Sequence, residues 1–114
     1  MEQQTYKSSK VHVPHTKIED YLLNPTKPHF KEFIDVGYMR GEGEKIFKDL
    51  ESGFDINNAT NFICYPDGAK EFVIYMLLGI TKKRTFRTVW RIDKLSTLPR
   101  FITAFRDKEG EQYV

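Results

Sequence analysis

The chain has 114 residues, of which 39% are hydrophobic and 14% aromatic, and it carries a net charge of +2. This composition excludes disorder for the middle of the chain and predicts one domain with a single core. No apolar run approaches the roughly 18 residues that a membrane helix requires, and the polar N-terminus lacks the apolar stretch of a secretory signal. We expect a cytoplasmic protein in which residues 1–10 form a flexible arm and residues 11–114 form a single domain.

The first half of the chain has the periodicity and the breakers of short helices. An extended piece at residues 11–15 is followed by Thr16 and Glu19, which have the spacing of a helix-capping pair. Apolar residues then recur at helical spacing, and prolines and glycines mark the segment ends. The three predicted helices run from Thr16 to the break at Asn24-Pro25, from near Pro28 to the stop at Gly37, and over residues 42–52 before Gly53.

After a loop at residues 55–60 the apolar period changes to that of strands. The predicted strands cover residues 62–65, 71–80, 84–92 and 98–105, with turns at 66–68 and 81–84. In the third strand, Phe86, Thr88, Trp90 and Ile92 share one face, and Thr85, Arg87, Val89 and Arg91 share the other. In the last strand, Phe101, Thr103 and Phe105 alternate with Arg100, Ile102 and Ala104. The fold class is therefore α+β, with helices on one face of an antiparallel sheet and the other face partly free.

Positive charge is concentrated in the last third of the chain. Residues 1–81 hold 9 Lys and Arg against 12 Asp and Glu, whereas residues 82–106 hold 8 basic residues against Asp93 alone. Two interpretations stay open: the segment docks a polyanion through phosphate contacts, or it is a well-solvated hairpin. The residues nominated for nucleic-acid binding are Lys82, Lys83, Arg84, Arg87 and Arg91.

The sequence gives no support for a metal or a cofactor. Cys64 is the only cysteine, which excludes an internal disulfide and a cysteine-based zinc site. Its strand-like surroundings favour a small buried side chain over a nucleophile. The histidines at positions 12, 15 and 29 lack the spacing of metal ligands on a helix. Gly41-Glu42-Gly43 is not a dinucleotide fingerprint, because it follows no strand and lacks the third glycine.

The polar residues that remain are of the types that metal-free RNA cleavage needs. Such an enzyme activates a 2′-hydroxyl, neutralises charge on the phosphorus oxygens and protonates the leaving 5′-oxygen. The candidates are His29, Lys17, Lys31, Arg87, Arg91, Arg100, Thr88 and Thr103. Each also has a structural interpretation, since lysines are commonly solvated on helices and threonines are common in strands. Trp90 is interpreted as a core anchor rather than a base-stacking platform.

Several segments, in this order, resemble a small uncharacterised domain family found at the C-termini of bacterial polymorphic and contact-dependent toxins and in phage-related proteins. The segments are KIEDYLLNP at residues 17–25, Pro28-His29, Phe33 to Gly37-Tyr38, Thr88-Val89-Trp90, and PRFITA at residues 99–104. The chain departs from this family at Phe30-Lys31-Glu32, which replaces a small basic Gly-Lys stretch. It also has no histidine in its last strands, which leaves the general acid unassigned.

That family is similar to the barnase/EndoU/colicin/RelE-like nuclease superfamily. The resemblance implies N-terminal helices packed on a four- to five-stranded antiparallel β-sheet. It also implies metal-independent cleavage of RNA, with tRNA as one candidate substrate, on the open sheet face beside the first helices. Carried over by position, it points to Lys17, His29, Lys31, Thr88, Arg100 and Thr103. A toxin of this type would have an immunity or antitoxin protein as its partner.

Two other functions stay open. A non-catalytic module of the same fold would bind RNA, a nucleotide or a host protein through the basic hairpin at residues 82–106. A structural phage component would have no ligand at all. An enzyme would be toxic when it is expressed and would lose that toxicity on His29→Ala or Arg100→Ala, whereas a binding module would lose affinity in steps as the hairpin is neutralised.

Overall fold

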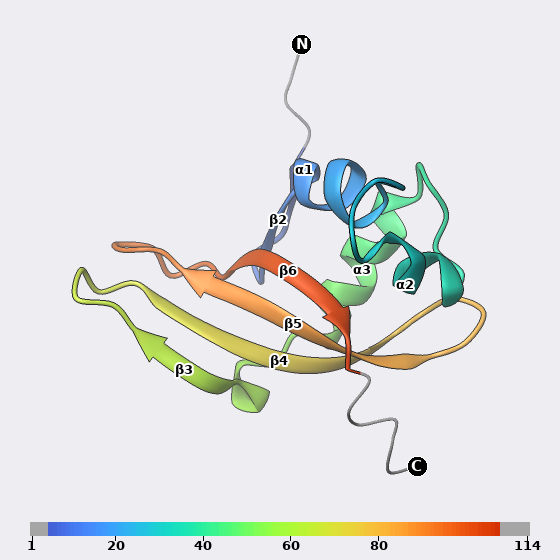
Figure 1. Cartoon of the computed structure of the whole chain (residues 1–114). Helices are drawn as coiled ribbons and strands as arrows, with labels where there is room; N and C mark the ends of the chain where they lie inside the picture. Colours follow the sequence, from blue (N-terminus) through green and yellow to red (C-terminus); the bar gives the residue numbers. More distant parts are fainter. Residues whose placement is uncertain (1–4, 108–114) are drawn as a thin grey trace.

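A computed structural model describes residues 5–107 of the chain as a mostly antiparallel six-stranded sheet with a few short helices (Figure 1). The fold is therefore α+β, but the predicted count of four to five strands was too low. The strands are β1 (Thr5–Lys7), β2 (His12–Pro14), β3 (Thr60–Cys64), β4 (Lys70–Leu78), β5 (Arg84–Ile92) and β6 (Arg100–Arg106), in the spatial order β1-β2-β6-β5-β4-β3.

The N-terminal strands account for the difference in strand number. β1 falls in the stretch predicted to be an arm, yet Thr5 to Lys7 pair antiparallel with β2. β2 in turn pairs parallel with β6 through His12 and Arg100, and the His12 N–H donates to the Pro99 carbonyl at 2.9 Å. Residues 1–4 of the predicted arm lie outside the described residues, as do residues 108–114 of the predicted domain.

The helical segments come between β2 and β3 in the chain, and all but the last of them gather on one side of the sheet (Figure 1). They are α1 (His15–Lys17), a π-helical turn η1 (Ile18–Leu22), α2 (Phe30–Asp35), α3 (Gly43–Gly53) and a 3₁₀ turn η2 (Ile56–Asn58). None of the helices within residues 5–107 is long and apolar enough to cross a bilayer.

The predicted helix ends are partly confirmed. The first helix begins at His15, directly after Pro14, and no side chain caps it, so the predicted capping role of Thr16 was wrong. Pro14 has already fixed the backbone entering that turn, which lets the helix begin one residue earlier. The predicted stop at Gly37 is confirmed: its φ of +106° is a conformation that favours glycine, and its N–H donates to the Ile34 carbonyl at 3.0 Å.

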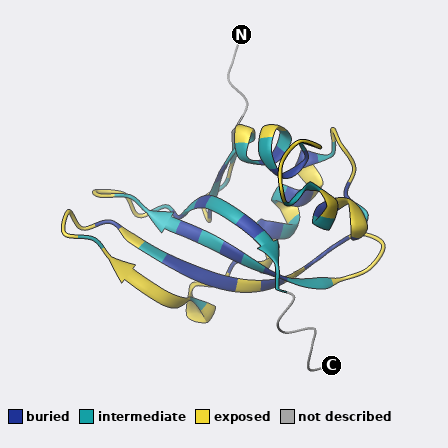
Figure 2. Ribbon diagram, in the orientation of Figure 1, coloured by how far each residue is buried: buried dark blue, intermediate teal, exposed yellow. Residues whose placement is uncertain are grey.

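The helices and one face of the sheet share a single core. Helical residues such as Phe33, Ile46 and Leu50 are fully buried with the sheet residues Phe72 and Trp90. Buried and half-buried residues alternate along β5, and buried and exposed residues alternate along the second half of β4, as the banding of those strands shows in Figure 2. This alternation confirms the predicted faces of β5.

The alternation predicted for the last strand was wrong in its second half. Trp90 pairs with Phe101, but Val89 pairs with Thr103, so β6 has one extra residue at this point. This β-bulge puts Phe101 and Ala104 together on the buried face, because an inserted residue exchanges the faces of all that follow. Thr103 and Phe105 therefore lie on the opposite face.

Candidate functional site

The sheet face that turns away from the core carries the candidate site. One row of paired residues crosses its centre: Tyr75 on β4 pairs with Arg87 on β5, which pairs with Phe105 on β6. We call these three residues the central row. The neighbouring row contains Val73, Val89 and Thr103. The central row is accessible, since Tyr75 is 43% exposed and its neighbour Leu77 on the same face is 67% exposed.

Arg87 is the cation at the centre of this face. Its Nη1 donates to the Tyr75 hydroxyl at 3.0 Å, and its guanidinium carbon lies 5.9 Å from the Tyr75 ring centroid. No carboxylate among residues 5–107 forms an ion pair with it. An arginine held by a hydroxyl rather than a carboxylate keeps its charge available for a phosphate.

His29 lies at the edge of the central row. Its ring stacks on Phe105 with centroids 5.4 Å apart and an interplanar angle of 24°. Its Nδ1 lies 3.1 Å from Glu32 Oε1, and the same carboxylate oxygen accepts the Arg106 N–H at 2.9 Å. Glu32 thus ties the start of α2 to the edge of β6. With Nδ1 donating to a carboxylate, Nε2 is left as the basic nitrogen.

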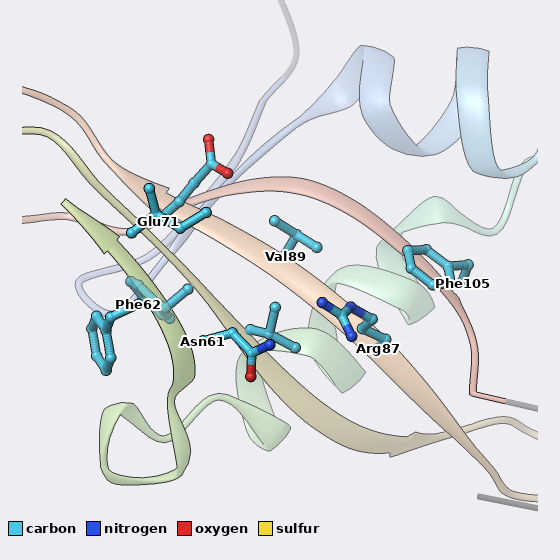
Figure 3. Close-up of a pocket in the computed structure, with 9 residues that line it drawn as sticks. Asn61, Phe62, Glu71, Arg87, Val89 and Phe105 are labelled. Carbon is cyan, nitrogen blue, oxygen red and sulfur yellow. The ribbon is translucent and has the colours of Figure 1, made fainter. Parts of the chain in front are cut away.

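A groove of about 530 Å³ runs across this face from β6 to β3. Figure 3 shows Phe105 at one end, Arg87 and Val89 along its length, and side chains of β3 and β4 at the other. Its volume lies within the range of small-molecule sites. Its walls are mainly apolar or aromatic, and the polar groups that line it are Asn61, Glu71 and Arg87.

Arg91 and Arg100, two of the predicted basic residues, form ion pairs with carboxylates at the end of the open face away from the central row. Asp93 accepts from Arg91 Nε at 2.9 Å and from Arg100 Nε at 3.0 Å, and Glu71 lies 3.5 Å from Arg91. Hydrogen bonds from Arg100 and then Arg91 hold the pKa of Asp93 below its ordinary value, and Asp93 in turn raises the pKa of Arg100. We call these four residues the Asp93 cluster.

The remaining basic candidates of the hairpin lie around the β4–β5 turn. Lys82 pairs with Asp35 at 3.2 Å, which also accepts from Arg106 at 3.0 Å. Arg84 donates to the Lys83 carbonyl at 2.9 Å, and no carboxylate among the described residues pairs with either Lys83 or Arg84.

The nominated catalytic residues do not form one constellation. Thr88 is fully buried on the core face, where its hydroxyl donates to the Ile74 carbonyl at 2.6 Å and accepts from Trp90 Nε1 at 2.8 Å. Its position assigns it a structural role and confirms Trp90 as a core residue. Lys31 is exposed on α2 and Lys17 is half-buried in α1. The structure brings Arg87, Thr103 and His29 to the open face.

Several residues of this face were not identified from sequence. Tyr75 lies in a nearly continuous apolar strand, but its period-two relation to Val73 and Leu77 would have placed it beside Arg87. The face of Phe105 was assigned wrongly because of the bulge in β6. Asn61 fell between the predicted loop and the predicted strand and was given no role. Cys64, predicted to be buried, is exposed on β3, because β3 is the last strand of the sheet. Among residues 5–107 no three His, Cys, Asp or Glu side chains gather to hold a metal.

Comparison with known proteins gives one match. Residues 5–108 match a family described as "Domain of unknown function (DUF6883)". No curated protein and no solved structure matches the chain. The family match spans nearly the whole chain and both edges of the open face, although its description assigns no activity. The chain therefore belongs to the DUF6883 family.

Proposed function

We propose that this protein is a metal-independent endoribonuclease of the bacterial toxin or phage type, and that it cleaves RNA on the open sheet face. The observation that carries the proposal is the central row, in which an arginine with no carboxylate partner within residues 5–107 lies between a tyrosine hydroxyl and the Phe105 ring, on which His29 stacks. Cation, hydroxyl and imidazole are the groups that cleavage through a 2′-hydroxyl uses.

The row also suits an in-line displacement. His29 Nε2 takes the proton of the 2′-hydroxyl as its oxygen forms a bond to phosphorus, and the bond from phosphorus to the 5′-oxygen breaks. Arg87 stabilises the charge on the phosphorus oxygens. Tyr75 accepts from Arg87, so its own proton can go to the leaving 5′-oxygen. Because β4 and β6 flank β5 at about 4.8 Å each, base and acid approach the phosphate from opposite sides.

A second candidate is RNA binding without cleavage on the same face. It is favoured by the scatter of the nominated catalytic residues, since Thr88 is enclosed in the core and Arg100 is held by Asp93. Aromatic rings beside an available cation are the usual components of single-strand binding. For a toxin, we propose that an immunity or antitoxin protein inhibits the enzyme by covering this face.

The test is incubation of the purified full chain with total cellular RNA and with a single-stranded oligonucleotide, both in EDTA. His29→Ala, Arg87→Ala and Tyr75→Phe are compared with wild type. Arg40→Ala is the matched control for charge, because Arg40 is exposed and lies outside the open face. We expect products ending in 2′,3′-cyclic phosphate and 5′-hydroxyl, with cleavage reduced by roughly 10² or more in Arg87→Ala and His29→Ala. Thermal melting checks that each variant is folded.

The outcome distinguishes the two candidates. Intact RNA together with binding that Arg87→Ala abolishes would favour the binding module over the enzyme. If RNA is neither cut nor bound, the central row has no role in RNA chemistry and both candidates fail.

A further inference from the structure

The edge strand β3 contains a local irregularity beside the groove. Thr60 pairs with Val73 and Ile63 pairs with Glu71, so three steps along β3 match two along β4. Asn61 lies within this bulge with a φ of +55°, a conformation that asparagine tolerates better than most residues. Bulges of this kind redirect side chains and occur frequently next to functional sites.

The bulge places the Asn61 amide at the groove. Asn61 lines the groove together with Phe62, and Figure 3 shows the Arg87 guanidinium extending toward the side where Asn61 lies. The Asn61 side chain makes no hydrogen bond to any residue within 5–107. It therefore presents a carbonyl acceptor and an NH₂ donor group to whatever occupies the groove.

The groove has a different chemistry at each end. Arg87 supplies a cation toward β6, and Val73 and Val89 supply an apolar floor. Toward β3 lie the Asn61 amide, the Glu71 carboxylate and the Phe62 ring, which is 55% exposed and braced against Phe72 with centroids 5.4 Å apart. A ligand that matches this order has an anionic group at one end and a flat ring with polar edges at the other.

We propose that the groove binds one nucleotide of the RNA, with a phosphate on Arg87 and the base read by Asn61. This inference rests on the proposed function and extends it to how one nucleotide of the substrate is held. The Asn61 amide carries both a carbonyl acceptor and an NH₂ donor, so it can pair with the donor and acceptor groups on the edge of a base. The exposed Phe62 ring beside it offers a face on which that base can stack.

The test measures binding of 2′-O-methyl tetranucleotides of adenine, cytosine and uracil by isothermal titration in EDTA. An enzyme that needs a 2′-hydroxyl cannot cut these probes. Asn61→Gly removes the amide and keeps a residue that accepts positive φ. Asn58→Gly is the matched control, because Asn58 is exposed in η2 outside the groove. Arg87→Ala tests the phosphate end.

We expect Asn58→Gly to bind each probe as tightly as wild type does. Asn61→Gly should weaken the binding of every probe by about fivefold, as the loss of one hydrogen bond implies, and Arg87→Ala should weaken all three alike. Unchanged affinities in Asn61→Gly or in Arg87→Ala, or no binding of any probe, would each overturn the inference. Cleavage of natural RNA, measured separately, decides whether the proposed function survives that result.

Discussion

At the scale of single residues, neighbours on β5 have opposite roles. Arg87 faces the groove, whereas Thr88, the next residue, is enclosed in the core. The threonine hydroxyl bridges a strand carbonyl and the indole N–H of Trp90. A hydroxyl with both its donor and its acceptor engaged inside the core supports the packing of the indole and has no access to a substrate.

This role predicts the effect of Thr88→Val. Valine has the shape of threonine but leaves the Trp90 N–H and the second bond of the Ile74 carbonyl without a partner, which should lower the free energy of unfolding by about 1–3 kcal/mol. Urea unfolding measures the change, and RNA affinity should stay at the wild-type level at temperatures where the variant is folded. Thr103→Val on the open face is the control, with an expected change within about 0.5 kcal/mol. Equal stability of the two variants would contradict the structural role of Thr88.

At the scale of elements, the sequence predicts the long segments well and the irregular ones poorly. The predicted 84–92 strand is β5, and the predicted 42–52 helix differs from α3 by one residue at each end. A regular hydrophobic period over nine or more residues allows these elements to be predicted from the sequence. The bulges in β3 and β6 were not predicted, because a single inserted residue leaves no signal in composition. Both bulges border the groove, so the site was less predictable than the fold that holds it.

The link between β5 and β6 predicts a pH dependence of stability. Asp93 → Asn should lower the free energy of unfolding at pH 7 by up to about 1 kcal/mol, because Asp93 anchors Arg91 and Arg100 while its side chain stays 43% exposed. The pKa of Asp93 is lower in the folded chain than its ordinary 3.8, so its contribution is present above pH 3.8 and is lost as the pH falls through the lower folded value. Urea unfolding at pH 7, 5 and 3 should show the difference between variant and wild type shrinking toward the lowest pH. Asp20→Asn, at an exposed position, is the control and should be as stable as wild type at pH 7. A variant as stable as wild type at every pH would rule out this contribution of the cluster.

At the scale of the whole molecule, the basic segment is less available than its composition suggests. Residues 82–106 contain eight Lys and Arg, but the folded chain pairs four of them, Lys82, Arg91, Arg100 and Arg106, with carboxylates. The carboxylates are Asp35, Glu71 and Asp93. Asp93 belongs to the segment itself, whereas Asp35 and Glu71 lie outside it in the sequence and are brought to it by the fold. The other four basic residues, Lys83, Arg84, Arg87 and Lys94, have no carboxylate partner within residues 5–107.

This division predicts the salt dependence of RNA binding. Each phosphate contact on a single strand contributes about −0.7 to the slope of log affinity against log salt. If only these four residues, which have no carboxylate partner within residues 5–107, contact phosphates, the slope should be about −3. Contact by all eight basic residues would give about −6. Titration of a single-stranded RNA between roughly 50 and 300 mM salt separates these values. Lys83→Gln with Arg84→Gln should reduce the slope by about 1.4. Lys82→Gln removes the same kind of charge from the same turn, but it should change the slope little, because Asp35 already neutralises Lys82. A slope near −6 would mean that RNA phosphates displace the carboxylates from the four paired basic residues. These ion pairs would then open when RNA binds, rather than persist as fixed structure.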